Sequence, residues 1–129
     1  MSADADRRAG AISTWAQAEL ARRQLLEFGQ RLDRQFRTPA HVRAIAAILE
    51  DVEAGRRRRV IFTVPPRHGK SRMLQLFSAW FLGRRPERDV VTASYAQELA
   101  DRNSRLSRAC IDDDRWPFAC RRRAGDRRG

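Results

Sequence analysis

The residues best suited to chemistry lie in the segment VPPRHGKS at positions 64–71. Phosphate-binding loops read G-x-x-x-x-G-K-[ST]. Gly69, Lys70 and Ser71 match the last three positions, while Val64 replaces the first glycine. Glycine lets the backbone approach phosphate oxygens, the lysine ammonium neutralises β- and γ-phosphate charge, and the serine hydroxyl completes a Mg²⁺ shell. The segment predicts a nucleotide-phosphate site; the alternative is an ordinary helix start that uses the same three residues.

Pro65 and Pro66 restrict where the hydrogen-bond donors of this loop can lie. Proline has no backbone N–H, so neither residue can donate to a phosphate. The donors must come from residues 67–71, and the prolines stiffen the turn that leads into them. Lys70 is the only lysine among 27 basic residues, at the position where a compact ammonium is needed.

The elements on either side of the loop are expected to position it. VIFTV at 60–64 is a β-branched and aromatic run typical of a buried parallel strand. The helix expected over 73–82 is too densely apolar for a surface helix, so we expect it to pack on a sheet. DVVTAS at 89–94 predicts a second strand, and a helix from about 95 to 111 follows. This order predicts a βαβ unit of a parallel sheet.

Two stripes of apolar residues upstream predict N-terminal helices. In both, apolar residues recur at spacings of three and four, as on one face of a helix. The first stripe comprises Ala21, Leu25, Phe28, Leu32 and Phe36. The second comprises Val42, Ile45, Ile48, Leu49 and Val52. The expected fold class is therefore α/β, with N-terminal helices followed by the βαβ unit.

Length and composition limit the classes of protein. A chain of 129 residues suits one domain. The 27 Lys plus Arg against 16 Asp plus Glu give a net charge of +11, which points to a polyanionic partner, although a GC-rich coding sequence explains the arginine bias equally well. No apolar stretch reaches the roughly 18 residues that span a bilayer, and the first ten residues are not a secretory signal. We expect no membrane association, a cytoplasmic location, and free thiols at Cys110 and Cys120.

From about residue 36 to residue 111 the sequence resembles the start of the ATPase domain of tailed-phage terminase large subunits. The resemblance rests on a whole string: PPRHGKS, an aromatic-rich helix ending in WFLGR at 80–84, Pro86, and a predicted strand that runs into Ser94 and Tyr95. It implies a P-loop NTPase fold of the additional-strand (ASCE) type, with ATP and Mg²⁺ as cofactors. It also implies double-stranded DNA, the small terminase subunit and the portal protein as partners.

The resemblance further implies roles for single residues. Arg67 is the implied γ-phosphate sensor, because family members often carry an arginine in this loop. Family members often have a glutamine that contacts adenine near the position of His41, which implies that His41 lies on the adenine side; the alternative is a histidine on a helix surface. Ser71 is the implied Mg²⁺ ligand in the ATP complex. The whole implied phosphate loop comprises Arg67, His68, Gly69, Lys70 and Ser71.

The residues that hydrolyse ATP are not found in this sequence. A P-loop ATPase needs an acid that holds Mg²⁺ and a glutamate that activates water, both after a later apolar strand. The acidic pairs at 50–51 and 112–113 follow apolar residues, but both fall on predicted helices. The acidic cluster of the family's nuclease domain is also absent. We therefore expect the ATP-binding part of a motor that packages viral DNA into procapsids, unable to hydrolyse ATP alone.

The expected organisation has three parts. Residues 1–20 are a flexible N-terminus, and residues 21–114 are the N-terminal half of a terminase-like ATPase domain. Residues 115–129 are an Arg/Gly-rich tail, disordered or read out of frame, with six arginines against one acid. The leading hypothesis is a truncated or frameshifted prophage gene in a bacterial host. The alternatives are a small basic nucleic-acid-binding protein without ATPase function, or another P-loop enzyme such as a helicase or kinase.

Two groups of arginines have the spacing to contact DNA phosphates. Four consecutive arginines occupy positions 56–59, and Arg102, Arg105 and Arg108 recur at three-residue spacing on one helical face. For both groups the alternative is a solvated surface without a partner.

Overall fold

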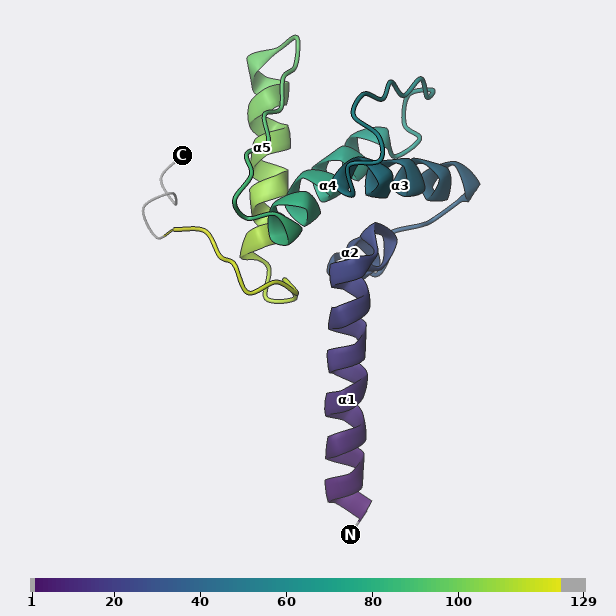
Figure 1. Cartoon of the computed structure of the whole chain (residues 1–129), viewed down its shortest axis with the longest axis vertical. Coiled ribbons are helices and arrows are strands. Elements are labelled where there is room, and N and C mark those ends of the chain that lie inside the picture. Colours follow the sequence, from purple (N-terminus) through teal and green to yellow (C-terminus); the bar gives the residue numbers. More distant parts are fainter. Residues whose placement is uncertain (1, 124–129) are drawn as a thin grey trace.

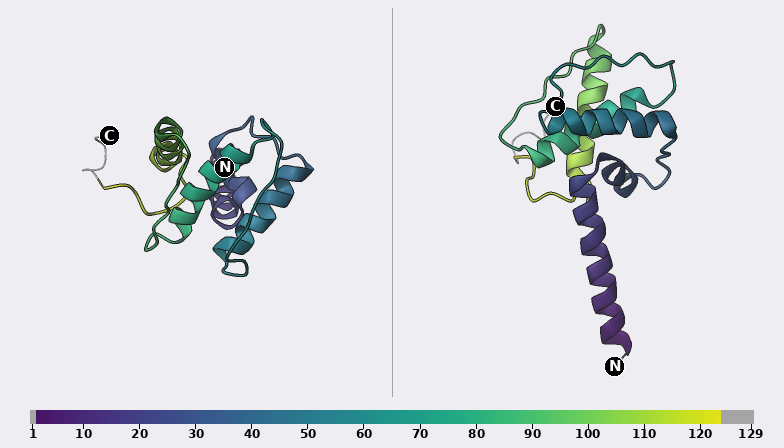
Figure 2. Two further views of the ribbon diagram at one scale, coloured as in Figure 1. Left: turned by 90° about the horizontal axis from the view of Figure 1, so that it is seen from above. Right: turned by 45° about the vertical axis from the view of Figure 1, so that its right-hand side comes forward.

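The computed structural model describes residues 2–123, which form five α-helices joined by loops (Figure 1). The helices are α1 (Ser2–Arg23), α2 (Leu25–Leu32), α3 (Ala40–Glu53), α4 (Lys70–Arg84) and α5 (Gln97–Asp112). Helices α2 to α5 cluster together (Figure 1). α1 extends away from them, so that its N-terminal end lies far from the cluster (Figures 1 and 2). A site built from several helices must therefore lie within the cluster or near the C-terminal end of α1.

α4 lies at the centre of the core. Its Met73, Leu76, Ala79 and Trp80 side chains are buried, and α1, α2, α3 and α5 all contact it. The two predicted stripes supply most of the surrounding residues. Their buried members are Ala21, Leu25, Phe28, Leu32, Val42, Ile45 and Leu49. Both apolar faces are therefore confirmed, although Gln24, with φ −126° and ψ 126°, divides the first stripe between α1 and α2.

The expected α/β fold is wrong for the described chain. Residues 2–123 contain no strand and no sheet. The segments 60–64 and 89–94, both predicted to be strands, are non-helical and make no ladder hydrogen bonds. The βαβ unit of a P-loop NTPase is therefore not formed among these residues, and the architecture is all-α.

Missing neighbours explain why the two apolar runs do not form strands. A strand needs adjacent strands for its N–H and C=O groups, and a parallel sheet needs cover on both faces. Here Ile61 is 94% exposed and Val91 is 91% exposed, so neither side chain contributes to a core. Phe62 and Val64 pack instead against the helical core. The surface of α4 that was expected to cover a sheet is occupied by other helices.

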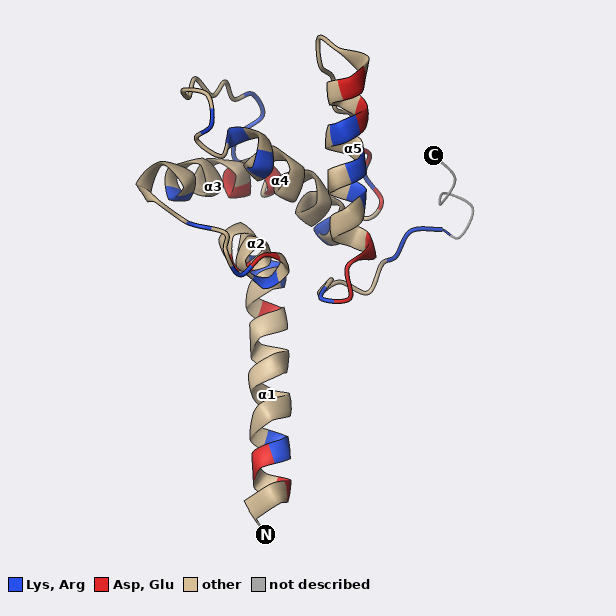
Figure 3. Cartoon of the chain, turned by 180° about the vertical axis from the view of Figure 1, so that it is seen from behind, with Lys and Arg blue, Asp and Glu red and all other residues tan. Residues whose placement is uncertain are grey.

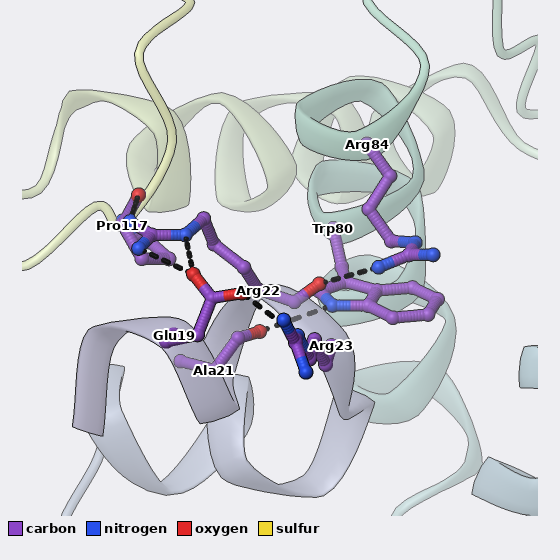
Figure 4. Close-up of polar contacts among 7 residues, drawn as sticks. All are labelled: Glu19, Ala21, Arg22, Arg23, Trp80, Arg84 and Pro117. Carbon is purple, nitrogen blue, oxygen red and sulfur yellow. Dashed lines mark hydrogen bonds and ion pairs between the residues drawn. The ribbon is translucent and has the colours of Figure 1, made fainter. Parts of the chain in front are cut away.

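Hydrogen bonds to the last carbonyl groups of α1 hold that helix to α4 (Figure 4). The last four carbonyls of a helix have no partner within the helix. Trp80 Nε1 donates to the Ala21 carbonyl oxygen at 3.1 Å, and Arg84 Nη1 donates to the Arg22 carbonyl oxygen at 2.8 Å. The Arg84 guanidinium also lies 5.0 Å from the centroid of the Trp80 ring. A cation thus stands at the negative end of the α1 dipole.

The segment that follows α5 has no regular element but contributes to the core. Trp116 and Phe118 are buried, and their rings lie 5.7 and 6.1 Å from the ring of Phe28. Arg22 Nη1 donates to the carbonyl oxygen of Pro117 at 2.7 Å (Figure 4). The tail expected from residue 115 therefore begins with core residues, and its part at 124–129 lies outside the described residues. At the other end, residues 2–20, expected to be flexible, form most of α1.

Charged residues are distributed over the helices and the connecting loops (Figure 3). Basic residues lie in the loop between α3 and α4 and along α5, whereas the middle of α1 is free of charge (Figure 3). None of the helices in residues 2–123 combines the length and the apolar character that crossing a membrane requires.

Candidate functional site

The loop that leads into α4 contains two residues with positive φ. Arg67 has φ 64°, and Gly69 has φ 82° and ψ 3°. Glycine adopts the left-handed conformation without strain, whereas for arginine it costs ~1–2 kcal/mol. A left-handed residue followed by a right-handed one turns successive N–H groups toward the same side, which makes an anion-binding concavity. Gly69 followed by helical Lys70 has this backbone form.

The first turn of α4 presents unpaired backbone donors beside this loop. The first helical hydrogen bond runs from the Met73 N–H to the Gly69 carbonyl oxygen at 2.9 Å. The N–H groups of Lys70, Ser71 and Arg72 precede it and have no partner within the helix. No side chain caps this end of α4. These N–H groups carry the positive end of the helix dipole, which attracts an anion.

A hollow of about 500 Å³ lies at this end of α4 and is lined by residues 64–72. Lys70 is half-buried in its wall, whereas Arg67, His68 and Ser71 are exposed. Arg67, Lys70 and Arg72 line the hollow, and no residue of its lining is acidic. The local charge is therefore positive, and the donors are those that hydrogen-bond phosphate oxygens.

His41 reaches this loop from the first turn of α3. Its Nε2 donates to the His68 carbonyl oxygen at 2.9 Å, and His68 Nδ1 donates to the Pro66 carbonyl oxygen at 2.9 Å. Each of these ring nitrogens carries its proton, because a carbonyl oxygen only accepts. The two imidazole rings lie 5.5 Å apart at 65°. His41 therefore braces the loop from outside, and it does not line the hollow.

Of the predicted site residues, Arg67, His68, Gly69, Lys70 and Ser71 line one hollow, whereas His41 contacts the loop from outside it. Two further residues at this place were missed by sequence reasoning. Arg72 lines the hollow one helical position beyond the motif. Val42 of α3 lies beside the loop, since its Cγ2 is 3.8 Å from the position that a Cβ on Gly69 would take. The basic character of Arg72 beside the motif was a usable signal. Nothing along the chain indicates that the first turn of α3 meets the loop.

The acidic pair at 50–51 is engaged away from the hollow. Glu50 Oε1 accepts the Leu25 N–H at 2.8 Å, at the N-terminal end of α2. Asp51 binds Arg56 Nη2 at 2.6 Å and Arg57 Nε at 3.1 Å. The hydrogen bonds from Arg56 and then Arg57 lower the pKa of Asp51, so it stays ionised and paired.

The second acidic pair, at the end of α5, is also engaged elsewhere. Asp113 binds Arg115 Nη2 at 2.9 Å, and this bond lowers the pKa of Asp113. Asp112 binds Arg122 Nη1 at 2.6 Å. Neither carboxylate lines the hollow at α4. The described chain therefore offers no carboxylate there that could activate a water molecule.

The donor set fits the phosphates of a nucleotide better than it fits a metal ion alone. Backbone N–H groups, an ammonium and guanidinium groups all donate to phosphate oxygens. Within residues 2–123, no group of three or more His, Cys, Asp or Glu side chains is placed to hold a metal ion. Ser71 can supply one oxygen ligand, which suits Mg²⁺ because this ion takes most of its other ligands from water and substrate phosphates.

Comparisons with protein-family models, with curated proteins and with solved structures find no match to this chain. The site must therefore be interpreted from its own geometry and from the motif that forms it.

Proposed function

We propose that the chain binds ATP through its phosphates, in the hollow formed by residues 64–72. The observation that carries this proposal is the combination of left-handed Gly69 with the uncapped N-terminal turn of α4, which begins at Lys70. Unpaired N–H groups and a lysine at the same end of a helix bind anionic phosphate through hydrogen bonds and charge together.

Each residue of the site has a proposed role. Gly69 and the N–H groups of the first turn bind phosphate oxygens, and Lys70 neutralises the β- and γ-phosphates. Ser71 supplies its hydroxyl to Mg²⁺, which would reduce the charge on the phosphates when ATP is bound. Arg67, which lines the hollow, is the proposed γ-phosphate sensor. His68 and His41 fix the loop through their carbonyl and ring contacts, with the adenine expected on the His41 side.

The proposed biological role is ATP binding in a motor that packages viral double-stranded DNA, in the cytoplasm of a bacterial host. Its support is the resemblance of the string from PPRHGKS to Ser94 and Tyr95 to terminase large subunits. The small terminase subunit and the portal protein are the partners that follow from that role. We expect no ATP turnover by this chain, because no carboxylate lines the hollow.

Thermal protection by ATP tests the proposal. A ligand at 100 times its Kd stabilises the folded state by about 2.7 kcal/mol, which raises Tm by several degrees in a chain of this size. We expect this shift with ATP and Mg²⁺ in the parent protein and its loss in Lys70→Ala. Arg8→Ala removes the same charge from the exposed first turns of α1 and should keep the shift. An equal shift in parent and Lys70→Ala proteins would contradict the proposal.

A second candidate is a basic nucleic-acid-binding protein without nucleotide chemistry. The observation that favours it is the number of exposed arginines outside the hollow, as in the loop between α3 and α4 (Figure 3). One variant, Lys70→Ala, distinguishes the two candidate functions. Salt-sensitive DNA binding that is unchanged by Lys70→Ala, with no protection by ATP, would favour this second function.

A further inference from the structure

Two arginine-rich turns that lie far apart in the sequence meet at the opposite end of α4. The first is residues 56–59, after α3, and the second is residues 85–88, after α4. A hollow of about 470 Å³ lies between them, and Arg58, Arg85 and Arg88 line it together with Glu53 and Phe81. α4 has 15 residues, so this hollow and the phosphate loop are separated by the ~22 Å length of that helix.

Glu53 is the buried anchor of this hollow. Its side chain is only 4% exposed and lies between two guanidinium groups, with Arg84 Nε and Arg85 Nε each at 3.1 Å from one of its carboxylate oxygens. A buried carboxylate with a cation on each oxygen fixes the positions of both arginines. Arg84 turns toward α1, where it donates to the Arg22 carbonyl oxygen. Arg85 lines the hollow, and its bond to Glu53 holds its guanidinium group in the wall.

Arg58 and Arg88 add charge that nothing in residues 2–123 neutralises. Neighbouring Arg56 and Arg57 both bind Asp51, whereas the side chains of Arg58 and Arg88 form no ion pair there. Arg58, Arg85 and Arg88 carry three positive charges in the lining and Glu53 carries one negative charge, which leaves a formal excess of +2. Glu87 and Asp89 flank Arg88 in the sequence, but neither lines the hollow. Two guanidinium groups without an ion pair, Arg58 and Arg88, beside a third that Glu53 holds in place attract an anion with several oxygens.

We propose that this hollow, which we call the arginine hollow, contacts a phosphate group in the backbone of duplex DNA. Its guanidinium groups come from two exposed turns rather than converging on one buried point. They also stand at the C-terminal ends of α3 and α4, where the helix dipoles disfavour a small isolated anion. Duplex DNA can bind despite these dipoles, because many of its phosphates contribute to the affinity and counterions are released on binding. The inference rests on the proposed function for the choice of DNA as the nucleic acid.

Duplex binding by the 129-residue chain tests the proposal in a pair of charge-matched variants. Arg58→Gln/Arg88→Gln removes two charges from the arginine hollow, and Arg7→Gln/Arg8→Gln removes two from the far end of α1. All four arginines are exposed, so neither variant is expected to unfold the protein. Fluorescence anisotropy with a labelled duplex of about 20 base pairs, at several salt concentrations between about 50 and 200 mM, gives affinity and salt slope.

The first variant should bind the duplex about tenfold more weakly than the second, and its salt slope should be smaller by about 1 for each phosphate that it no longer neutralises. Equal affinities and slopes in the two variants would overturn the proposal. Inorganic tripolyphosphate is the probe for a free anion. If Arg58→Gln/Arg88→Gln weakened tripolyphosphate binding but left duplex binding unchanged, the proposal would also be overturned. Lys70→Ala should bind the duplex normally, so failure of ATP binding and failure of the arginine hollow are distinguishable.

Discussion

Arg67 and Gly69 determine the shape of the phosphate loop because both have positive φ. The positive φ has a different consequence at each of the two positions. At Gly69 a Cβ would have open space up to Val42, 3.8 Å away, so the backbone conformation rather than crowding requires glycine. At Arg67 a side chain is kept despite the strain of the left-handed conformation. Strain that persists at a loop is typical of functional positions, and Arg67 is one of the residues that line the hollow.

Gly69→Ala tests this reasoning at the scale of one residue. We expect a loss of ~1–2 kcal/mol in the free energy of unfolding, because alanine is strained at φ 82°, and a weaker ATP affinity. Gly10→Ala is the matched control: the position lies within α1, where nothing stands within 4 Å of the added Cβ, so it should stabilise by about 0.8–1 kcal/mol. Urea denaturation measures the free energy of unfolding of both variants, and equal changes in the two would contradict the role of the backbone conformation.

At the scale of the elements, side chains of α4 bind the C-terminal end of α1 through hydrogen bonds. Besides the bonds from Trp80 and Arg84, Glu19 organises the last turn of α1 (Figure 4). Its carboxylate binds Arg22 Nη2 at 2.6 Å and Arg23 Nε at 2.7 Å. Arg22 in turn donates to the segment that follows α5, at Pro117. One carboxylate thus orients the arginine that ties α1 to the C-terminal segment.

The pH dependence of stability tests this junction. The hydrogen bond from Arg22, more than that from Arg23, lowers the pKa of Glu19. A carboxyl whose pKa is lower in the folded state stabilises the protein above its unfolded pKa of about 4.3, and this stabilisation is lost as the pH falls through the lower folded value. Glu19→Gln should therefore show a smaller fall in the urea midpoint between about pH 5 and pH 3.

Glu87→Gln is the control for this measurement, because Glu87 is exposed and forms none of the ion pairs found in residues 2–123. It should keep the pH dependence of the parent protein. If Glu19→Gln and Glu87→Gln gave the same dependence, Glu19 would not be part of a stabilising junction.

At the scale of the whole molecule, the helices and much of the core follow from the sequence, but the architecture does not. Residues such as Val42, Ile45 and Leu49 are buried as their spacing indicates. The segment 60–64 resembles a strand because a short apolar run looks the same in a sheet and in a loop packed on one side. Only tertiary contacts decide between them, and here Phe62 packs on helices while Ile61 remains exposed.

The sequence predicts the residues of the candidate site, but not the tertiary contacts around it. The spacing of Gly69, Lys70 and Ser71 identifies the loop and the helix that it opens. The contact of His41 with the His68 carbonyl depends on how α3 packs beside α4, so no local pattern contains it. The burial of Trp116 and Phe118 is hidden by the arginine-rich composition around them.

A pair of tryptophan variants tests whether the C-terminal segment belongs to the folded core. Trp116→Ala removes a buried ring that contacts Phe28 edge-on and should cost ~3–5 kcal/mol of unfolding free energy. Trp15→Ala removes the same side chain from α1, where it is 65% exposed, and should change stability by no more than about 0.5 kcal/mol. Equal, small effects in urea denaturation would mean that the segment after α5 is not part of the core.

The central claim is that the hollow at the N-terminal end of α4 binds ATP through Lys70. Isothermal titration calorimetry of ATP and Mg²⁺ into the parent, Lys70→Ala and Arg8→Ala proteins tests it most directly. We predict saturable one-to-one binding to the parent and to Arg8→Ala, and an affinity at least about tenfold weaker for Lys70→Ala, because this variant cannot form a charge-assisted hydrogen bond to phosphate. The same affinity for the parent and Lys70→Ala proteins, or no binding to the parent, would contradict the claim.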